Sequence, residues 1–135
     1  MALRSDNDEA DTMLSAATLL ILGRILLGGL FVVAGIRHFF LLPVLTPVIA
    51  ARGVPAAKSA LIAGSVFQII AGAMLMAGIA VAFAAFGLVA FTIAASILLV
   101  NFWDMQGAER ENAKNVLLSN MAIVGGLLIA AAQSL

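Results

Sequence analysis

The sequence contains no cysteine, only one histidine and little charge. The absence of cysteine excludes thiol redox chemistry, disulfide bonds and cysteine-ligated metal sites, and one histidine cannot form a histidine-rich metal site. Seven basic residues balance seven acidic ones, so the charge indicates no nucleic-acid partner. No carboxylate pair and no Ser/His/Asp arrangement is evident. We therefore predict no catalytic residue and no metal site in this chain alone.

Apolar residues make up 64% of the 135 residues, and charged residues make up 10%. A soluble domain is about 45–50% apolar and about 25% charged. A domain of this size still leaves a large surface facing its solvent, so the excess cannot be hidden in a core. The sequence therefore predicts an integral membrane protein whose main partner is the lipid bilayer.

Four segments reach the length of about 20 apolar residues that a transmembrane helix needs. They cover residues 13–36, 59–79, 80–103 and 115–135. The second and third together form an apolar run, residues 60–100, that would be roughly 60 Å long as one helix. Because that is about two bilayer thicknesses, we expect the run to fold back near Gly78, Ile79 and Ala80.

Residues 44–51 are apolar but too few to cross a bilayer, so we predict a short interfacial helix there. The fold class is all-α: a four-helix transmembrane bundle over residues 13–135, with this short helix between helices one and two. Residues 1–12 are expected to form a mobile acidic tail, and residues 104–114 a mixed-charge loop.

Basic residues predict the orientation of the bundle. The loops after helices one and three carry most of them, and only Arg4 and the α-amino group lie on the other side. The positive-inside rule places these loops in the cytoplasm and both termini outside. The loop residues are Arg37, Arg52, Lys58, Arg110 and Lys114.

Small residues recur at helical spacing, as membrane helix interfaces require. In the second predicted helix, Gly64 and Gly72 flank Gln68 on one face. The first predicted helix carries a longer stripe, made of Arg24, Gly28, Phe31, Gly35 and His38. We interpret these glycines as packing residues.

Arg24 is the charge that the first predicted helix carries within the membrane. Burying an arginine near the bilayer centre costs about 2.5–3.5 kcal/mol on insertion scales, so it needs a partner. It either ties helices together or contacts a ligand, and a guanidinium suits a quinone carbonyl or an oxyanion. No acidic residue lies in the four segments, so its predicted protein partners are neutral: Gln68, Ser65, Thr92, Ser96 or backbone carbonyls.

A second polar cluster is expected near the cytoplasmic interface. His38 is either a proton relay or part of the interfacial belt, and Trp103 fits an aromatic belt. Asn120 is expected to hydrogen-bond Asn101 across the bundle. The candidate ligand-binding residues are Arg24, Gln68, His38, Asn101, Trp103 and Asn120.

Three segments together resemble the DoxX family of bacterial four-helix integral membrane proteins. GRILLGGLFVVAGIRHFF resembles its first helix, with Arg24 matching the arginine that typically opens it. RGVPAAKSALIAGSVFQIIAGAMLMAG resembles its second helix, and NFWDMQGAERENAKNVLLSNMAIVGGLL its third loop and fourth helix. This chain has Gln68 and Ser119–Asn120 where the family usually has a glutamate and Lys-Asn. Arg24 thus lacks its expected carboxylate, which favours a ligand that supplies the counter-charge.

The resemblance implies a location and a function. Some relatives are subunits of thiosulfate:quinone oxidoreductase, and others associate with redox or stress-response partners. We therefore predict an accessory or anchoring subunit of a quinone-linked redox complex in the bacterial cytoplasmic (inner) membrane. It would have no intrinsic cofactor, a quinone-sized cleft near Arg24 and Gln68, and a redox-protein partner or homo-oligomeric state. The alternatives are an oligomeric small-solute carrier and a structural assembly or stress-associated factor.

Overall fold

The computed structural model describes residues 5–135, and all regular structure there is helical. Four of its helices are long and apolar enough to cross a membrane. This confirms the predicted four-helix bundle and its short additional helix. The elements are α1 (Asp6–Phe40), α2 (Leu42–Ala51), α3 (Ala57–Ala77), α4 (Val81–Leu99), the 3₁₀ helix η1 (Phe102–Asp104) and α5 (Gly107–Gln133).

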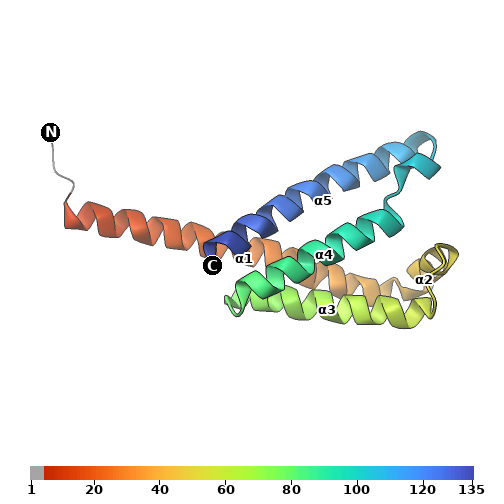
Figure 1. The fold of residues 1–135 in the computed structure, drawn as a ribbon, viewed down its shortest axis with the longest axis horizontal. Coiled ribbons are helices and arrows are strands. Elements are labelled where there is room, and N and C mark those ends of the chain that lie inside the picture. Colours follow the sequence, from red (N-terminus) through yellow and green to blue (C-terminus); the bar gives the residue numbers. More distant parts are fainter. Residues whose placement is uncertain (1–4) are drawn as a thin grey trace.

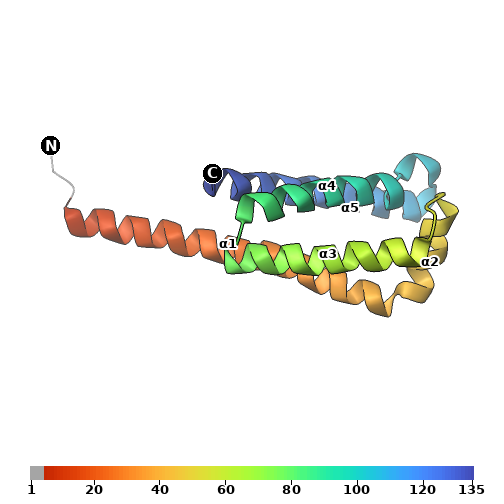
Figure 2. The same cartoon turned by 60° about the horizontal axis from the view of Figure 1, so that its bottom comes forward.

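The four long helices form two antiparallel pairs. Helix α1 packs along α3, and α4 packs along α5, so the pairs make two layers (Figure 2). The short helix α2 lies across one end of the bundle, and the C-terminus of α5 lies at the opposite end (Figure 1). The first half of α1 extends beyond the other helices at that opposite end.

Helix α1 begins earlier than predicted. It starts at Asp6, so residues 6–12 belong to the helix and not to an acidic tail; residues 1–4, including Arg4, lie outside the described residues. Ser5 is the N-cap, and its hydroxyl accepts a hydrogen bond from the Asp8 amide at 3.2 Å. Acidic residues in the first turn stabilise the positive end of the helix dipole. The acidic run thus starts the helix.

The fold-back between α3 and α4 lies where the sequence predicts it. Gly78 ends α3 with a left-handed φ of 77°, and its amide bonds back to the Leu75 carbonyl. The Ile79 amide bonds to the Met74 carbonyl at 2.9 Å, which satisfies a second free carbonyl of the helix end. Glycine adopts this backbone conformation without the Cβ clash of other residues.

The predicted loop over residues 104–114 is mostly helical, which corrects that boundary. Helix α4 ends at Leu99, and after η1 helix α5 begins at Gly107. Alanine, glutamate, arginine and lysine are good helix formers, so the charged segment continues the apolar helix beyond its membrane span. The sequence pattern located the end of the apolar stretch and not the end of the helix.

Small side chains fill the interior, and large apolar side chains face outward. Leu75, Leu88 and Leu127 are fully buried among alanines of α3, α4 and α5. By contrast, Leu26 and Phe83 are 76% and 77% exposed. An apolar surface of this extent is stable only against lipid. The arrangement is that of a small integral membrane protein.

Three glycines allow α1 and α3 to touch through their backbones: Gly28 and Gly35 of α1 and Gly72 of α3. A Cβ atom on Gly72 would lie 2.7 Å from the Gly28 carbonyl oxygen, and one on Gly35 would lie 2.9 Å from the Ser65 carbonyl oxygen. Gly28, Phe31 and Gly35 are the buried residues of α1. This confirms the predicted packing stripe, and it sets the register in which Gly28 opposes Gly72 and Gly35 opposes Ser65.

Candidate functional site

A cavity of about 320 Å³ lies between the two helix pairs, in the half of the bundle nearer α2. Its volume falls within the range of about 300–1,000 Å³ that is usual for small-molecule sites. Most of its wall is apolar and includes the side chains of Phe31, Phe91 and Leu99. Four helices contribute its polar lining: His38 from α1, Ser65 and Gln68 from α3, Thr92 from α4 and Asn120 from α5.

Two phenylalanines hold α3 and α4 apart beside this cavity. Phe91 of α4 covers Gly64 of α3, where a Cβ atom would lie 3.2 Å from the ring. Phe67 of α3 covers Gly87 of α4 in the same way, and the two ring centroids are 6.1 Å apart. Because these glycines receive aromatic rings instead of a facing backbone, the helices stay separated and leave space between the pairs.

Two buried polar groups in the cavity wall have no partner among the described residues. Gln68 is 4% exposed, and neither its amide oxygen nor its NH2 group forms a hydrogen bond within residues 5–135. The Thr92 hydroxyl is also buried without a partner in the described chain. Each unsatisfied buried group costs about 1–3 kcal/mol. A ligand that exchanged hydrogen bonds with both would recover that energy.

His38 belongs to a short hydrogen-bonded chain at the cavity wall. Ser65 donates its hydroxyl proton to the Leu61 carbonyl oxygen at 2.7 Å, and its oxygen lies 3.3 Å from His38 Nδ1. Since that proton is already engaged, the Ser65 oxygen accepts a hydrogen bond from Nδ1–H. The neutral imidazole then carries its lone pair on Nε2.

Asn120 also reaches the cavity, but its partner differs from the predicted one. Its amide Nδ2 donates to the Ser96 hydroxyl oxygen at 2.9 Å, and Ser96 donates to the Thr92 carbonyl oxygen at 2.7 Å. The predicted bond between Asn120 and Asn101 is wrong. Asn101 lies beyond the end of α4, whereas Ser96 lies on the face of α4 that packs against α5.

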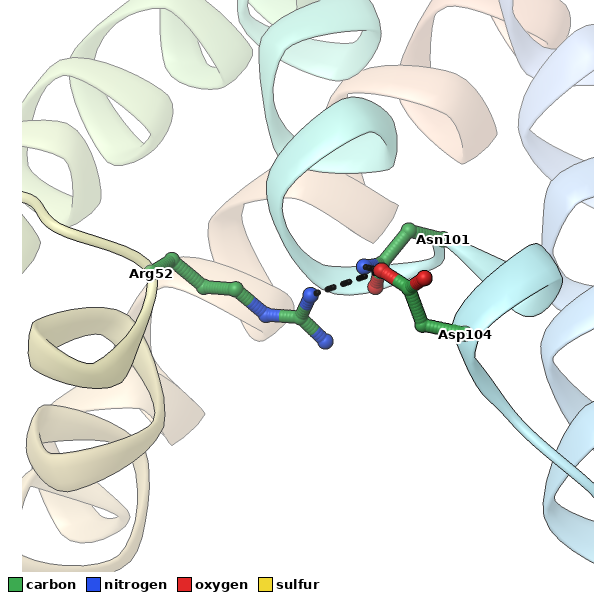
Figure 3. Close-up of polar contacts among 3 residues, drawn as sticks. All are labelled: Arg52, Asn101 and Asp104. Atoms are coloured by element: carbon green, nitrogen blue, oxygen red, sulfur yellow. Dashed lines mark hydrogen bonds and ion pairs between the residues drawn. The ribbon is translucent and has the colours of Figure 1, made fainter.

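Asn101 instead belongs to a polar cluster at the end of the bundle that carries α2 (Figure 3). Its amide Nδ2 donates to Asp104 Oδ2 at 2.9 Å, and an Arg52 nitrogen lies 3.8 Å from the same carboxylate oxygen. This contact connects the end of α2 to the segment after α4. Trp103 is 61% exposed and packs edge-on against Phe102. Neither Asn101 nor Trp103 lines the cavity.

Arg24 lies far from Gln68, so the predicted cleft between them is wrong. In the α1–α3 register Gln68 is level with Phe31, whereas Arg24 is level with the C-terminus of α3. The guanidinium covers Gly78, where a Cβ atom would lie 3.1 Å from it. It forms no hydrogen bond or ion pair within residues 5–135, and its Nε atom is buried without a partner. Its predicted bonds to Gln68, Ser65, Thr92 or Ser96 are therefore absent from the described chain.

The sequence was also compared with known proteins. The family model DoxX matches residues 19–101, which is more than half of the chain. The chain belongs to the DoxX family. Comparison with curated proteins and with solved structures gives no match.

The DoxX match covers most of α1, all of α2, α3 and α4, and ends at Asn101. It includes four of the cavity's polar residues and Arg24, while α5 with Asn120 lies beyond it. The family assignment therefore supports a multi-pass membrane protein.

Sequence reasoning found three of the cavity's polar residues and missed the others. Gln68, His38 and Asn120 were candidates, whereas Ser65 and Thr92 were named only as partners of Arg24. Phe91 was not singled out at all. A detectable signal was available: Gln68 and Ser65 lie one helical turn apart in an apolar helix, as do Thr92 and Ser96, which marks two facing polar stripes.

Proposed function

We propose that this DoxX-family protein is an accessory or anchoring subunit of a quinone-linked redox complex, and that its central cavity receives the quinone head group. The observation that carries the proposal is a pair of buried groups, on Gln68 and Thr92, in the wall of a membrane-embedded cavity; neither group has a partner within residues 5–135. Buried polar groups inside a membrane bundle are costly, and they commonly mark a ligand pathway.

The residues fit the chemistry of a quinone. A quinone carries electrons by interconverting its carbonyl and hydroxyl forms. The Thr92 hydroxyl and the Gln68 NH2 group are donors for carbonyl oxygens, and His38 Nε2 and the Gln68 amide oxygen are acceptors for hydroxyl groups. Phe31 and Phe91 supply apolar contact for the ring. The chain's role at this site is to bind and orient the head group.

Charge supports an orientation for the complex. Arg37, Arg52 and Lys58 all lie at the end of the bundle that carries α2, and the basic residues at the start of α5 follow α4 at that same end. The positive-inside rule then places this end in the cytoplasm of a bacterial cell. The cavity would thus lie in the cytoplasmic half of the inner membrane, close to a cytoplasmic redox partner.

A quinone titration tests the binding site. The purified protein in nanodiscs would be titrated with a short-chain ubiquinone while its melting temperature is recorded. We expect the melting temperature of the wild type to rise and to saturate with quinone concentration. Gln68→Leu should bind the quinone about tenfold more weakly, because one or two hydrogen bonds are lost. Gln133→Leu is the matched control, because Gln133 lies at the other end of the bundle, outside this cavity. Equal affinities for both variants would contradict the site.

Co-purification tests the accessory role separately. The tagged protein would be extracted from native membranes in mild detergent, and the bound proteins identified. The proposal expects a redox enzyme in stoichiometric amount, and its retention by Gln68→Leu would separate anchoring from quinone binding. Recovery of this chain only as a homo-oligomer would contradict the accessory role.

A further inference from the structure

A second site lies at the opposite end of the bundle from the cavity. A crevice of about 910 Å³ opens between α1 and α5, with Arg24 and Gln133 as its polar residues. On the bundle side of Arg24 its walls are apolar and include Leu26, Leu27 and Leu30. We propose that this crevice binds the phosphate of an anionic phospholipid through Arg24, with the acyl chains lying along its apolar walls.

The depth of Arg24 matches that of a lipid phosphate. Helix α3 has 21 residues, so it is about 31 Å long, close to the hydrocarbon thickness of about 30 Å. Arg24 lies level with the C-terminus of α3, against Gly78. Its guanidinium therefore sits at the boundary between hydrocarbon and head groups, and not at the bilayer centre.

Among the described residues, Arg24 has no acidic partner. The nearest acidic residue along the chain is Asp11, which lies more than three helical turns away on the same helix. Within residues 5–135 no carboxylate contacts the guanidinium, and its Nε atom has no hydrogen-bond partner. The partial negative charge at the C-terminus of α3 offsets only about half of the elementary charge on Arg24. An anion is needed to complete the site.

The residues around Arg24 favour the phosphate group of a phospholipid over free phosphate. A guanidinium forms paired hydrogen bonds with phosphate oxygens. Gly78 leaves room for the guanidinium to lie flat against the turn, because any side chain there would occupy its place. The surrounding walls are as apolar as acyl chains, and the crevice lies between α1 and α5.

Native mass spectrometry tests the proposal. The protein would be released from nanodiscs made of equal amounts of phosphatidylcholine and phosphatidylglycerol, and its retained lipids identified. We expect at least about fivefold enrichment of phosphatidylglycerol on the wild type and its loss on Arg24→Gln. Arg24→Lys keeps the charge without the paired hydrogen bonds, so we expect a smaller enrichment on that variant. Lys58→Gln is the matched control, because it removes one positive charge at the α2 end. That variant should retain the enrichment.

Three results would overturn the proposal. The first is equal retention of both lipids by the wild type, a result that does not depend on whether a variant folds. The second is an equal loss in Arg24→Gln and Lys58→Gln, which would reflect general surface charge. The third concerns the source of the phosphate: if inorganic phosphate raised the melting temperature in pure phosphatidylcholine nanodiscs as much as phosphatidylglycerol does, the ligand would be a soluble anion.

Discussion

The interface between α1 and α3 and the interface between α3 and α4 use the same residue type in opposite ways. Gly28 and Gly72 bring two backbones into contact, so that a Cβ atom on Gly72 would lie 2.7 Å from a carbonyl oxygen. Gly64 and Gly87 instead receive the rings of Phe91 and Phe67. Glycine facing a backbone closes an interface, whereas glycine facing an aromatic ring supports one that stays open. The bundle thereby combines a closely packed pair of helices with a cavity beside it.

The largest expected effect is at the closed interface. Gly28→Ala places a methyl group against the Gly72 carbonyl and the Met76 backbone, which cannot move aside without separating the helices. We expect a loss of about 2–3 kcal/mol in the free energy of unfolding, at the upper end for an overpacked site. Unfolding in mixed micelles with increasing dodecyl sulfate measures it. Gly125→Ala is the control, because a Cβ atom there meets nothing within 4 Å. Equal stabilities of the two variants would show that α1 and α3 are not in backbone contact.

The second effect has the opposite sign and lies in the open region. Thr92→Val removes a buried hydroxyl that has no partner within the described chain, and it keeps the side-chain shape. We expect a gain of about 1 kcal/mol in the same unfolding measurement, together with weaker quinone binding. Thr18→Val is the control, because Thr18 is exposed and its hydroxyl bonds to the Leu14 carbonyl oxygen. Reduced stability of Thr92→Val would indicate that the hydroxyl is satisfied within the protein.

The smallest effect is expected for a glycine-to-alanine substitution at the open interface, between α3 and α4. Gly87→Ala brings a methyl group to 2.8 Å from the Phe67 ring, yet that ring is 38% exposed and can swing toward lipid. We expect a loss of less than about 1 kcal/mol. Direct comparison with Gly28→Ala in one experiment makes the contrast quantitative. If Gly87→Ala lowered the free energy of unfolding as much as Gly28→Ala does, the two interfaces would be packed alike.

Much of the fold could be predicted because membrane burial dictates composition and length. The four spans, the short helix between the first two, the fold-back at Gly78 and the packing stripe through Gly28 and Gly35 all follow from apolar runs and residue spacing. The helix ends did not follow, because polar segments such as residues 6–12 and 107–114 are helical outside the apolar runs. Local capping by Ser5 and good helix formers decides those ends.

The site was predicted only in part, because it depends on register between helices. Depth counted from a predicted start at Met13 placed Arg24 near the bilayer centre and beside Gln68. The glycine contacts between α1 and α3 set a register that places Arg24 at the end of the bundle. Asn101 and Asn120 were paired for a similar reason, although Asn101 bonds to Asp104 three residues away. Spacing along one helix is visible in the sequence, whereas the alignment of two helices is not.

The cavity between the helix pairs is tested most directly by photolabelling. Native membranes containing the protein would be irradiated with an azido-quinone, and the labelled peptides mapped by mass spectrometry. We predict label on the segments of α3 and α4 around Gln68 and Thr92, and its suppression by excess unlabelled quinone. Label confined to the lipid-facing surface, or to the segment around Arg24, would contradict a quinone site in this cavity.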